Sequence, residues 1–171
     1  MINLIPAERA EELLALLRGS RKIVLTCHRS PDGDALGSTL GFAEFLRVMG
    51  KMPVVIVPDQ FPDFLKWLPT IEKVIRADRS PNIAKMQIEN ADLICCLDYA
   101  QYSRCESLGD MIEASKATKL VIDHHEEPLI ETPWLFSFPN LSSTAELVFR
   151  LIYDMGQSAN IKKNAATCIY C

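Results

Sequence analysis

The sequence contains no apolar run long enough to span a membrane. A transmembrane helix needs about 20 consecutive apolar residues, and no segment of this chain approaches that length. The first residues also lack the basic stretch followed by an apolar stretch that is typical of a secretory signal. We therefore expect a cytoplasmic protein that does not associate with membranes.

Basic residues are also fewer than acidic residues in this chain. The chain has 18 lysines and arginines against 22 acidic residues, which gives a formal net charge of −4. This balance argues against a broad electrostatic contact with long nucleic acid. It does not exclude a short anionic substrate held by metal ions, because acidic metal ligands add to the negative charge when the ions are absent.

The six cysteines do not form a zinc or redox pattern. Cys95 and Cys96 are neighbours in an apolar segment, so in a strand they would face opposite sides of a sheet as small buried side chains. Cys168 and Cys171 have C-x-x-C spacing, but no second pair completes a zinc site and no thioredoxin-like turn surrounds them. We interpret both as buried cysteines of a helix.

Apolar periodicity predicts strands that alternate with helices along the whole chain. The predicted strands are residues 22–27, 51–57, 92–97, 119–122 and 134–138. The predicted helices are residues 6–18, 35–49, 104–115, 143–155 and 161–171, and a further helix opens at Ser80-Pro81. This order predicts an α/β fold with a mostly parallel, open sheet and helices on both faces. At 171 residues the chain suits a single domain, residues 1–171.

Side chains that bind metals follow three of the predicted strands. The first strand leads into His28, the third ends on Asp98, and the fourth ends on Asp123, followed by His124 and His125. These positions include all 3 histidines of the chain. Because the carboxyl ends of parallel strands lie along one edge of a sheet, we expect these side chains to meet.

Two further carboxylates, Asp32 and Asp34, stand in the turn after His28. A simpler interpretation makes Pro31-Asp32-Gly33 a tight turn and Asp34 a helix N-cap, but it leaves His28 without a role. Two carboxylates this close would repel each other unless a cation lay between them. We therefore favour a site for divalent metal ions.

The donor set limits which ions fit this site. Mixed imidazole and carboxylate ligands suit Mn²⁺, with Mg²⁺, Fe²⁺ and Zn²⁺ as alternatives. The candidate ligands would over-supply one ion, whereas two ions sharing a carboxylate would use all of them. Ions roughly 3.5–4 Å apart in such a site clamp phosphoryl oxygens and activate water.

The three motifs resemble a known family. His28-x-x-x-Asp32-x-Asp34, Asp98 and Asp123-His124-His125 are similar to motifs I, II and III of the DHH phosphoesterases, the superfamily of RecJ-type exonucleases and family II inorganic pyrophosphatases. The segment 28–38 most resembles the nano-RNase branch, which degrades short oligoribonucleotides and dephosphorylates pAp (3′-phosphoadenosine 5′-phosphate). Pyrophosphatases usually have threonine where Gly33 stands here. Pyrophosphatase- or exopolyphosphatase-like activity and cyclic-dinucleotide phosphodiesterase activity stay open as alternatives.

The resemblance implies a role for each motif residue. It implies that His28 and Asp32 bind a first metal ion, that Asp34 and His124 bind a second, and that Asp98 bridges both. It implies that Asp123 orients a ligating imidazole, and that His125 and Arg104 contact the scissile phosphate. The catalytic residues would then be Asp98, His125 and Arg104, and the cofactors two divalent ions, Mn²⁺ or Mg²⁺. Ser142, Ser143 and Thr144 match the family's next motif and would offer hydroxyls and a helix N-terminus to phosphate.

Some of these residues have simpler alternatives. Arg104 also fits a solvated arginine at a helix start, and Ser143 also fits a plain N-cap. The rival class for the whole protein is a non-catalytic nucleotide-binding or regulatory domain. We disfavour it because a binding module need not retain a bridging carboxylate such as Asp98.

Two features of the family have no counterpart in this sequence. The family provides another metal-binding aspartate in a strand that follows the helix near Lys162, and a carboxyl-terminal domain with a glycine- and histidine-rich substrate loop. We therefore expect a DHH catalytic domain that is incomplete at its carboxyl end and has little activity alone. The exposed end favours either self-association, for instance as a homodimer, or disorder.

Overall fold

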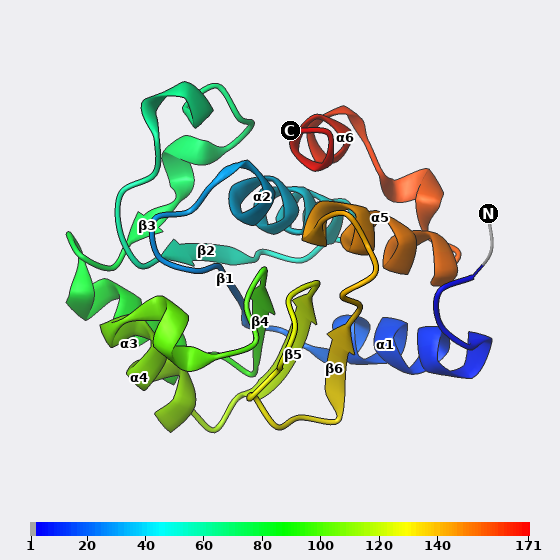
Figure 1. The fold of residues 1–171 in the computed structure, drawn as a ribbon, viewed down its shortest axis with the longest axis horizontal. Coiled ribbons are helices and arrows are strands. Elements are labelled where there is room, and N and C mark those ends of the chain that lie inside the picture. Colours follow the sequence, from blue (N-terminus) through cyan, green and yellow to red (C-terminus); the bar gives the residue numbers. More distant parts are fainter. Residues whose placement is uncertain (1–2) are drawn as a thin grey trace.

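The computed structural model describes residues 3–171, and a six-stranded sheet forms its centre (Figure 1). Its strands are β1 Ile23–Thr26, β2 Val54–Val57, β3 Ile75–Arg76, β4 Leu93–Leu97, β5 Thr118–Asp123 and β6 Trp134–Ser137. The strands lie in the order β3-β2-β1-β4-β5-β6, and each neighbouring pair is parallel. The α/β class and the parallel sheet predicted from the sequence are confirmed.

The strand order reverses direction once, between β1 and β4. The chain runs outward from β1 through β2 to β3, returns to place β4 on the other side of β1, and continues outward to β5 and β6. The loops that leave β1 and β4 therefore diverge to opposite sides of the sheet. In open α/β sheets the crevice at the carboxyl ends of two such strands is where ligands bind.

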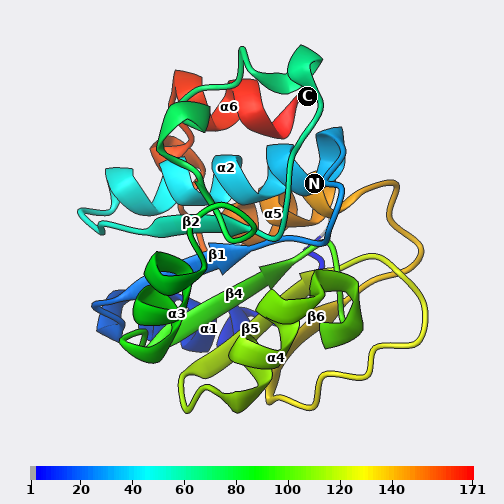
Figure 2. The same cartoon turned by 90° about the vertical axis from the view of Figure 1, so that its left-hand side faces the viewer.

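Helices cover both faces of the sheet, and Figure 2 shows α3 and α4 together on the face opposite α2 and α6. One core contains side chains from α1 Ala7–Gly19, α2 Gly33–Val48, α5 Thr144–Asp154 and α6 Lys163–Ile169. The other contains side chains from α3 Pro81–Glu89 and α4 Ser107–Ala114. Four short 3₁₀ turns connect these elements: η1 Asp63–Leu65, η2 Ile71–Lys73, η3 Tyr102–Cys105 and η4 Ser158–Asn160.

The central strands β1 and β4 are buried on both faces and, apart from Thr26, consist of apolar residues and cysteines. Cys95 belongs to the core under α2 and α5, and Cys96 to the core under α3 and α4. The prediction that these neighbours face opposite sides of the sheet is confirmed. Cys168 is also buried, as predicted, but the interpretation of Cys171 as a buried helix residue is wrong, because it follows the end of α6 and is exposed.

The predicted helix over residues 104–115 is divided into two elements. The turn η3 ends at Cys105, and α4 begins at Ser107. Between them Glu106 has a φ of 51°, a backbone conformation that α-helices do not contain. The turn packs directly on the helix, since a Cβ built at Gly109 would lie 2.0 Å from the carbonyl oxygen of Tyr102. The chain direction therefore changes just after Arg104.

Within residues 3–171, no helix combines the length and the apolar character needed to cross a bilayer.

Candidate metal centre

The loops that leave β1, β4 and β5 bring His28, Asp98, His124 and His125 together. Asp98 lies at the centre of this group. Its Oδ2 is 3.3 Å from Nε2 of His28, and its Oδ1 is 3.7 Å from Nε2 of His124 and 3.9 Å from Nδ1 of His125. Imidazoles from two distant segments of the sequence therefore surround one carboxylate.

Asp98 is held in an unusual conformation. It is 2% exposed, and its φ of 63° is uncommon for a residue other than glycine. Burial by itself raises the pKa of Asp98, but hydrogen bonds from His28 and from the Thr144 hydroxyl outweigh it and lower the pKa below its usual value. Asp98 is thus a buried carboxylate that its surroundings keep ionised.

Each of the three imidazoles has a hydrogen-bond acceptor beside its Nδ1. The acceptors are the Arg29 carbonyl at 2.7 Å from His28, the Leu141 carbonyl at 3.2 Å from His124, and Oδ1 of Asp123 at 2.8 Å from His125. Because carbonyl and carboxylate oxygens only accept, Nδ1 must carry the proton in each ring. A neutral imidazole then leaves Nε2 free to bind a metal ion or substrate.

His28 is nearly buried, and its pKa has two opposing influences. Burial lowers the pKa of this imidazole, whereas its hydrogen bonds to Asp98 and to the Arg29 carbonyl raise it, and the net shift is upward. A positive charge between His28 and Asp98, whether a proton or a metal ion, is therefore favoured at this position.

Two groups of side chains have the spacing of a metal site. One is His28, Asp32 and Asp98, and the other is Asp98, His124 and His125; within each group the ligand atoms lie within 4.8 Å of one another. Asp98 belongs to both groups, which is the arrangement that two ions sharing a carboxylate require. The oxygen and imidazole donors fit Mn²⁺. The second group includes His125, for which the sequence predicts a phosphate contact.

Asp34 lies beside the second group but has its own partners. Its Oδ2 and Oδ1 accept hydrogen bonds from the backbone N–H groups of Thr144 and Ala145, both at 2.8 Å, at the start of α5. Its Oδ2 is also 3.5 Å from Nε2 of His124. Burial and the charge of Asp98 raise the pKa of Asp34 despite these amide bonds, so the two carboxylates repel each other unless a cation neutralises them.

The N-cap of α2 is Asp32 and not Asp34. Oδ1 of Asp32 accepts a hydrogen bond from the Ala35 N–H at 3.0 Å. The alternative in which Asp34 caps its own helix is therefore wrong. The cap occupies one oxygen of Asp32, and the rest of this exposed carboxylate stays available to the group around His28.

Asp123 is a fully buried carboxylate at the end of β5. Its Oδ1 contacts His125, while its Oδ2 has no hydrogen-bond partner within the described residues. A buried carboxylate oxygen without a partner is costly unless positive charge lies nearby. This feature agrees with cations in the adjacent centre.

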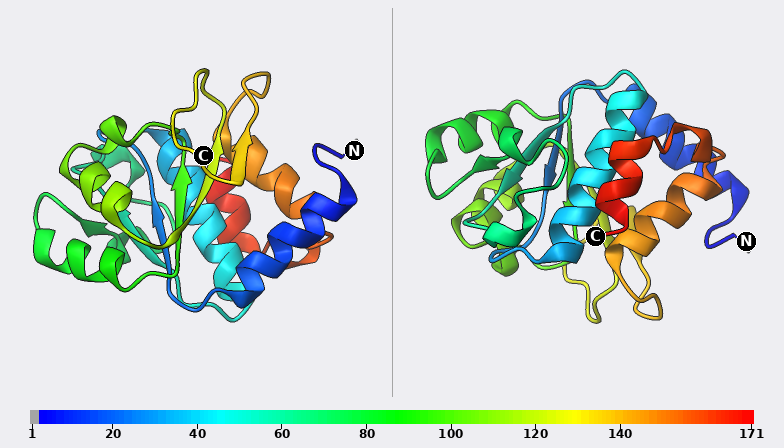
Figure 3. Two further views of the ribbon diagram at one scale, coloured as in Figure 1. Left: turned by 90° about the horizontal axis from the view of Figure 1, so that it is seen from below. Right: turned by 90° about the horizontal axis from the view of Figure 1, so that it is seen from above.

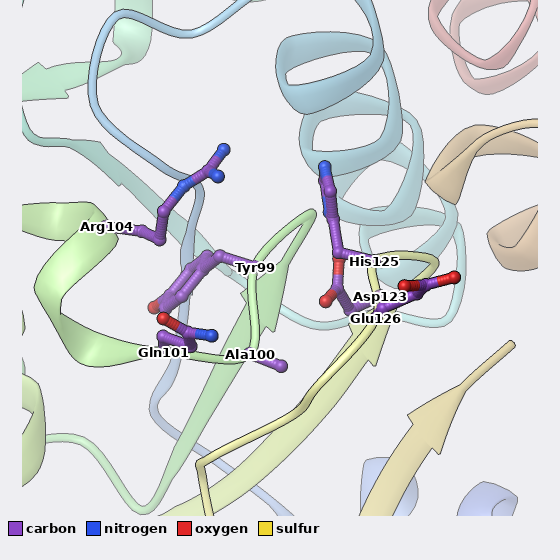
Figure 4. Close-up of a pocket in the computed structure, with 7 residues that line it drawn as sticks. All are labelled: Tyr99, Ala100, Gln101, Arg104, Asp123, His125 and Glu126. Carbon is purple, nitrogen blue, oxygen red and sulfur yellow. The ribbon is translucent and has the colours of Figure 1, made fainter. Parts of the chain in front are cut away.

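A pocket of about 200 Å³ opens next to the imidazoles (Figure 4). Figure 4 shows Arg104 and His125 on opposite sides of it, with Tyr99 and Gln101 between β4 and η3. The Arg104 guanidinium is exposed and makes no hydrogen bond or ion pair with any residue from 3 to 171. The lining residues are Tyr99, Ala100, Gln101, Arg104, Asp123, His125 and Glu126. Sequence reasoning missed Tyr99 and Gln101, and their only signal was their position just after Asp98.

The three hydroxyl residues before α5 all have partners inside the protein. Ser142 donates to Oε2 of Glu146 at 2.7 Å, and the Ser143 hydroxyl accepts from the Glu146 N–H at 3.0 Å as the N-cap. The Thr144 hydroxyl donates to Asp98 at 2.8 Å. The predicted capping box is present in altered form. The Glu146 carboxylate accepts hydrogen bonds from Ser142 and not from the backbone N–H of the N-cap residue, Ser143. Substrate contacts of these residues stay predictions.

Comparison with known sequences identifies a family. The model described as "DHH family, N-terminal domain" matches residues 22–171. The cyclic-di-AMP phosphodiesterase PdeA of Listeria monocytogenes is 27% identical over 168 residues, which cover 94% of this chain and 25% of that protein. A probable manganese-dependent inorganic pyrophosphatase of Streptococcus mutans is 24% identical over 140 residues, which cover 79% of this chain and 42% of that protein.

Solved structures agree with this result. An exopolyphosphatase-related protein from Bacteroides fragilis is 42% identical and superposes with a TM-score of 0.96 over 99% of this chain and 50% of its own. Exonuclease RecJ bound to manganese shares the fold, with a TM-score of 0.52 and 20% identity over 93% of this chain and 40% of its own. The chain thus spans half or less of the length of these relatives.

Proposed function

Because this chain belongs to the DHH family and its acidic and imidazole groups converge on one carboxylate, we propose that it is the metal-binding catalytic domain of a phosphoesterase. The proposed substrates are short oligoribonucleotides and pAp. The observation that carries the proposal is the position of Asp98, buried and shared by two groups with metal-site spacing. A binding module has no need for this shared carboxylate.

The proposed ligands combine the two groups of the centre with the family resemblance, which assigns Asp34 to the second ion in place of His125. His28, Asp32 and Asp98 would hold one ion, and Asp98, His124 and Asp34 the other. Manganese is supported by the donor set and by the relatives whose names include it. When bound, a pair of such ions polarises phosphoryl oxygens and lowers the pKa of water.

The chain's own residues would bind and orient the phosphate. The unpaired guanidinium of Arg104 and the imidazole of His125 face the same pocket, where both can contact phosphoryl oxygens. Oδ1 of Asp123 accepts the Nδ1 proton of His125, and a second proton on Nε2 makes the ring an imidazolium that can donate to a phosphoryl oxygen. Positive groups held in place before the reaction stabilise the charge that develops on the phosphate.

A second candidate is a cyclic-dinucleotide phosphodiesterase, since a relative matched over 94% of this chain bears that name. The same centre would serve this reaction, because oligoribonucleotides and cyclic dinucleotides are both phosphodiesters of nucleotides. Pyrophosphatase activity is disfavoured by Gly33, where those enzymes usually have threonine.

The test is hydrolysis by the full-length protein in Mn²⁺ with pAp, a diribonucleotide, cyclic-di-AMP and pyrophosphate as substrates. We expect release of phosphate or mononucleotide from the first two. The variant Asp98→Asn keeps the side-chain volume but removes the shared charge, so we expect turnover to fall at least about 10³-fold, or about 4 kcal/mol. Circular dichroism serves as the folding control.

Each other result has a defined meaning. Turnover of Asp98→Asn near the wild-type rate would exclude the shared-ligand assignment. Cleavage of cyclic-di-AMP or pyrophosphate alone would move the protein to the branch of those relatives. No hydrolysis of any substrate by the wild type in saturating Mn²⁺ would favour the non-catalytic alternative.

A further inference from the structure

Thr144 connects two carboxylates of the centre, Asp98 and Asp34, that come from different loops. It is the first residue of α5 and is fully buried. Its hydroxyl donates to Oδ1 of Asp98 at 2.8 Å, and its backbone N–H donates to Oδ2 of Asp34 at 2.8 Å. One residue therefore holds a carboxylate at the end of β4 and another in the first turn of α2.

From this geometry we propose that Thr144 is a positioning residue, which sets the orientation of Asp98 and its separation from Asp34 for metal binding. The proposal rests on the proposed function, because it assumes that these carboxylates bind metal ions. It replaces the phosphate contact that the sequence suggests for the Thr144 hydroxyl.

The proton of the hydroxyl decides between these two roles. A threonine hydroxyl has one proton to donate, and Thr144 donates it to Asp98. Phosphate oxygens are acceptors at neutral pH, so the same hydroxyl has no proton left for them. Ser142 likewise donates its proton, to Glu146. The Ser143 hydroxyl instead accepts from the Glu146 N–H, which leaves its own proton free and makes it the better phosphate-contact candidate.

The orientation of Asp98 depends on few contacts. Its backbone has a φ of 63°, so the side chain leaves β4 at an angle that a regular strand does not give. Nε2 of His28 lies near Oδ2, and the Thr144 hydroxyl is the closest donor to Oδ1. Without that hydroxyl, repulsion from Asp34 can rotate the carboxylate away from His124. If Asp98 is a ligand of both ions, its rotation weakens the binding of each.

The test uses Thr144→Val, which keeps the β-branched shape and the backbone N–H to Asp34 but removes the hydroxyl. Calorimetric titration of the chain with Mn²⁺ measures the affinity. We expect the affinity to fall 10–100-fold, the range found when a group that orients a metal ligand is removed. Thr144→Ser restores the hydroxyl and should return most of the affinity.

A matched control is Thr39→Val in α2. Thr39 is also fully buried, but its hydroxyl has no hydrogen-bond partner within the described residues. This variant should bind Mn²⁺ like the wild type. If Thr144→Val does not fold, Thr144→Ser and Thr144→Cys keep the test possible, because Ser retains the donor and Cys replaces it with a weak one at similar size.

The outcomes separate this proposal from the proposed function. A wild-type chain that binds no Mn²⁺ overturns both. Wild-type binding with equal affinity in Thr144→Val overturns the positioning role alone. In the full-length enzyme, a raised KM for pAp with unchanged Mn²⁺ affinity would return Thr144 to the role of a substrate contact.

Discussion

At the scale of single residues, the two adjacent histidines after β5 differ in the acceptor that each imidazole contacts. His124 gives its Nδ1 proton to a neutral carbonyl of Leu141, whereas His125 gives it to the buried carboxylate of Asp123. Nε2 of His124 lies between Asp34 and Asp98, and His125 lines the pocket opposite Arg104. Neighbours in sequence therefore have different surroundings.

These surroundings predict that replacing each histidine by alanine has a different effect. His124→Ala removes a nitrogen that lies within 4 Å of two carboxylates, so Mn²⁺ affinity should fall more than about tenfold. His125→Ala should keep the affinity and lower turnover of the full-length protein about 100-fold, because we propose that this imidazole contacts phosphate. Calorimetry and steady-state kinetics on both variants measure these effects.

The control for this pair is the melting temperature of each metal-free variant, which should be similar because both imidazoles are only partly buried. Equal losses of Mn²⁺ affinity would assign His125 to the metal, in agreement with its place beside Asp98 and His124.

At the scale of elements, the contact between α2 and α6 depends on glycine. Figure 3 shows α6 lying along α2. A Cβ built at Gly37 would be 2.5 Å from the Cys168 carbonyl oxygen, and one built at Gly41 would be 2.6 Å from Cγ1 of Ile169. These distances are too short for any real Cβ, so the two backbones can approach this closely only where α2 has no side chain. The same helix begins at the turn with Asp32 and Asp34.

Gly37→Ala should therefore destabilise the protein even though alanine is the better helix former. The added methyl meets backbone and forces α6 away, which we expect to cost about 1–3 kcal/mol of unfolding free energy. Gly19→Ala is the control, because nothing lies within 4 Å of the Cβ position at the end of α1. Urea denaturation compares the two variants, and equal stabilities would mean that α6 moves without cost.

At the scale of the whole molecule, the candidate centre exists only in the folded chain. Its side chains come from the loops after β1, β4 and β5 and from the start of α5. Those segments meet because the strand order places β4 between β1 and β5. An ion bound there stabilises the native state and not the unfolded chain.

Mn²⁺ should consequently raise the melting temperature. At a free concentration about 100 times Kd, one ion adds about 2.7 kcal/mol, which corresponds to roughly 5–10 °C for a chain of this size. A chelator should reverse the shift, and Asp98→Asn should abolish most of it in a thermal scan. A shift of the same size in Asp98→Asn would mean that the stabilising ion binds elsewhere.

Local signals in the sequence were enough to predict the fold class and the positions of the candidate ligands. Apolar segments of strand length alternate with helical patterns, and His28, Asp98 and Asp123 each follow such a segment. The parallel arrangement then requires these strand ends to lie at one edge, because every crossover helix returns the chain to the same side. These inferences need only local patterns and one rule of chain topology.

The partners of each side chain were decided by the tertiary structure. The sequence suggests Asp34 as the cap and Asp32 as a turn residue, but the backbone of their turn aims Asp32 at Ala35, while Asp34 reaches α5 more than a hundred residues later. The Thr144 hydroxyl likewise has its partner, Asp98, just after the end of a distant strand. A hydrogen bond between segments far apart in sequence depends on how helices pack across the sheet, and no local pattern encodes that packing.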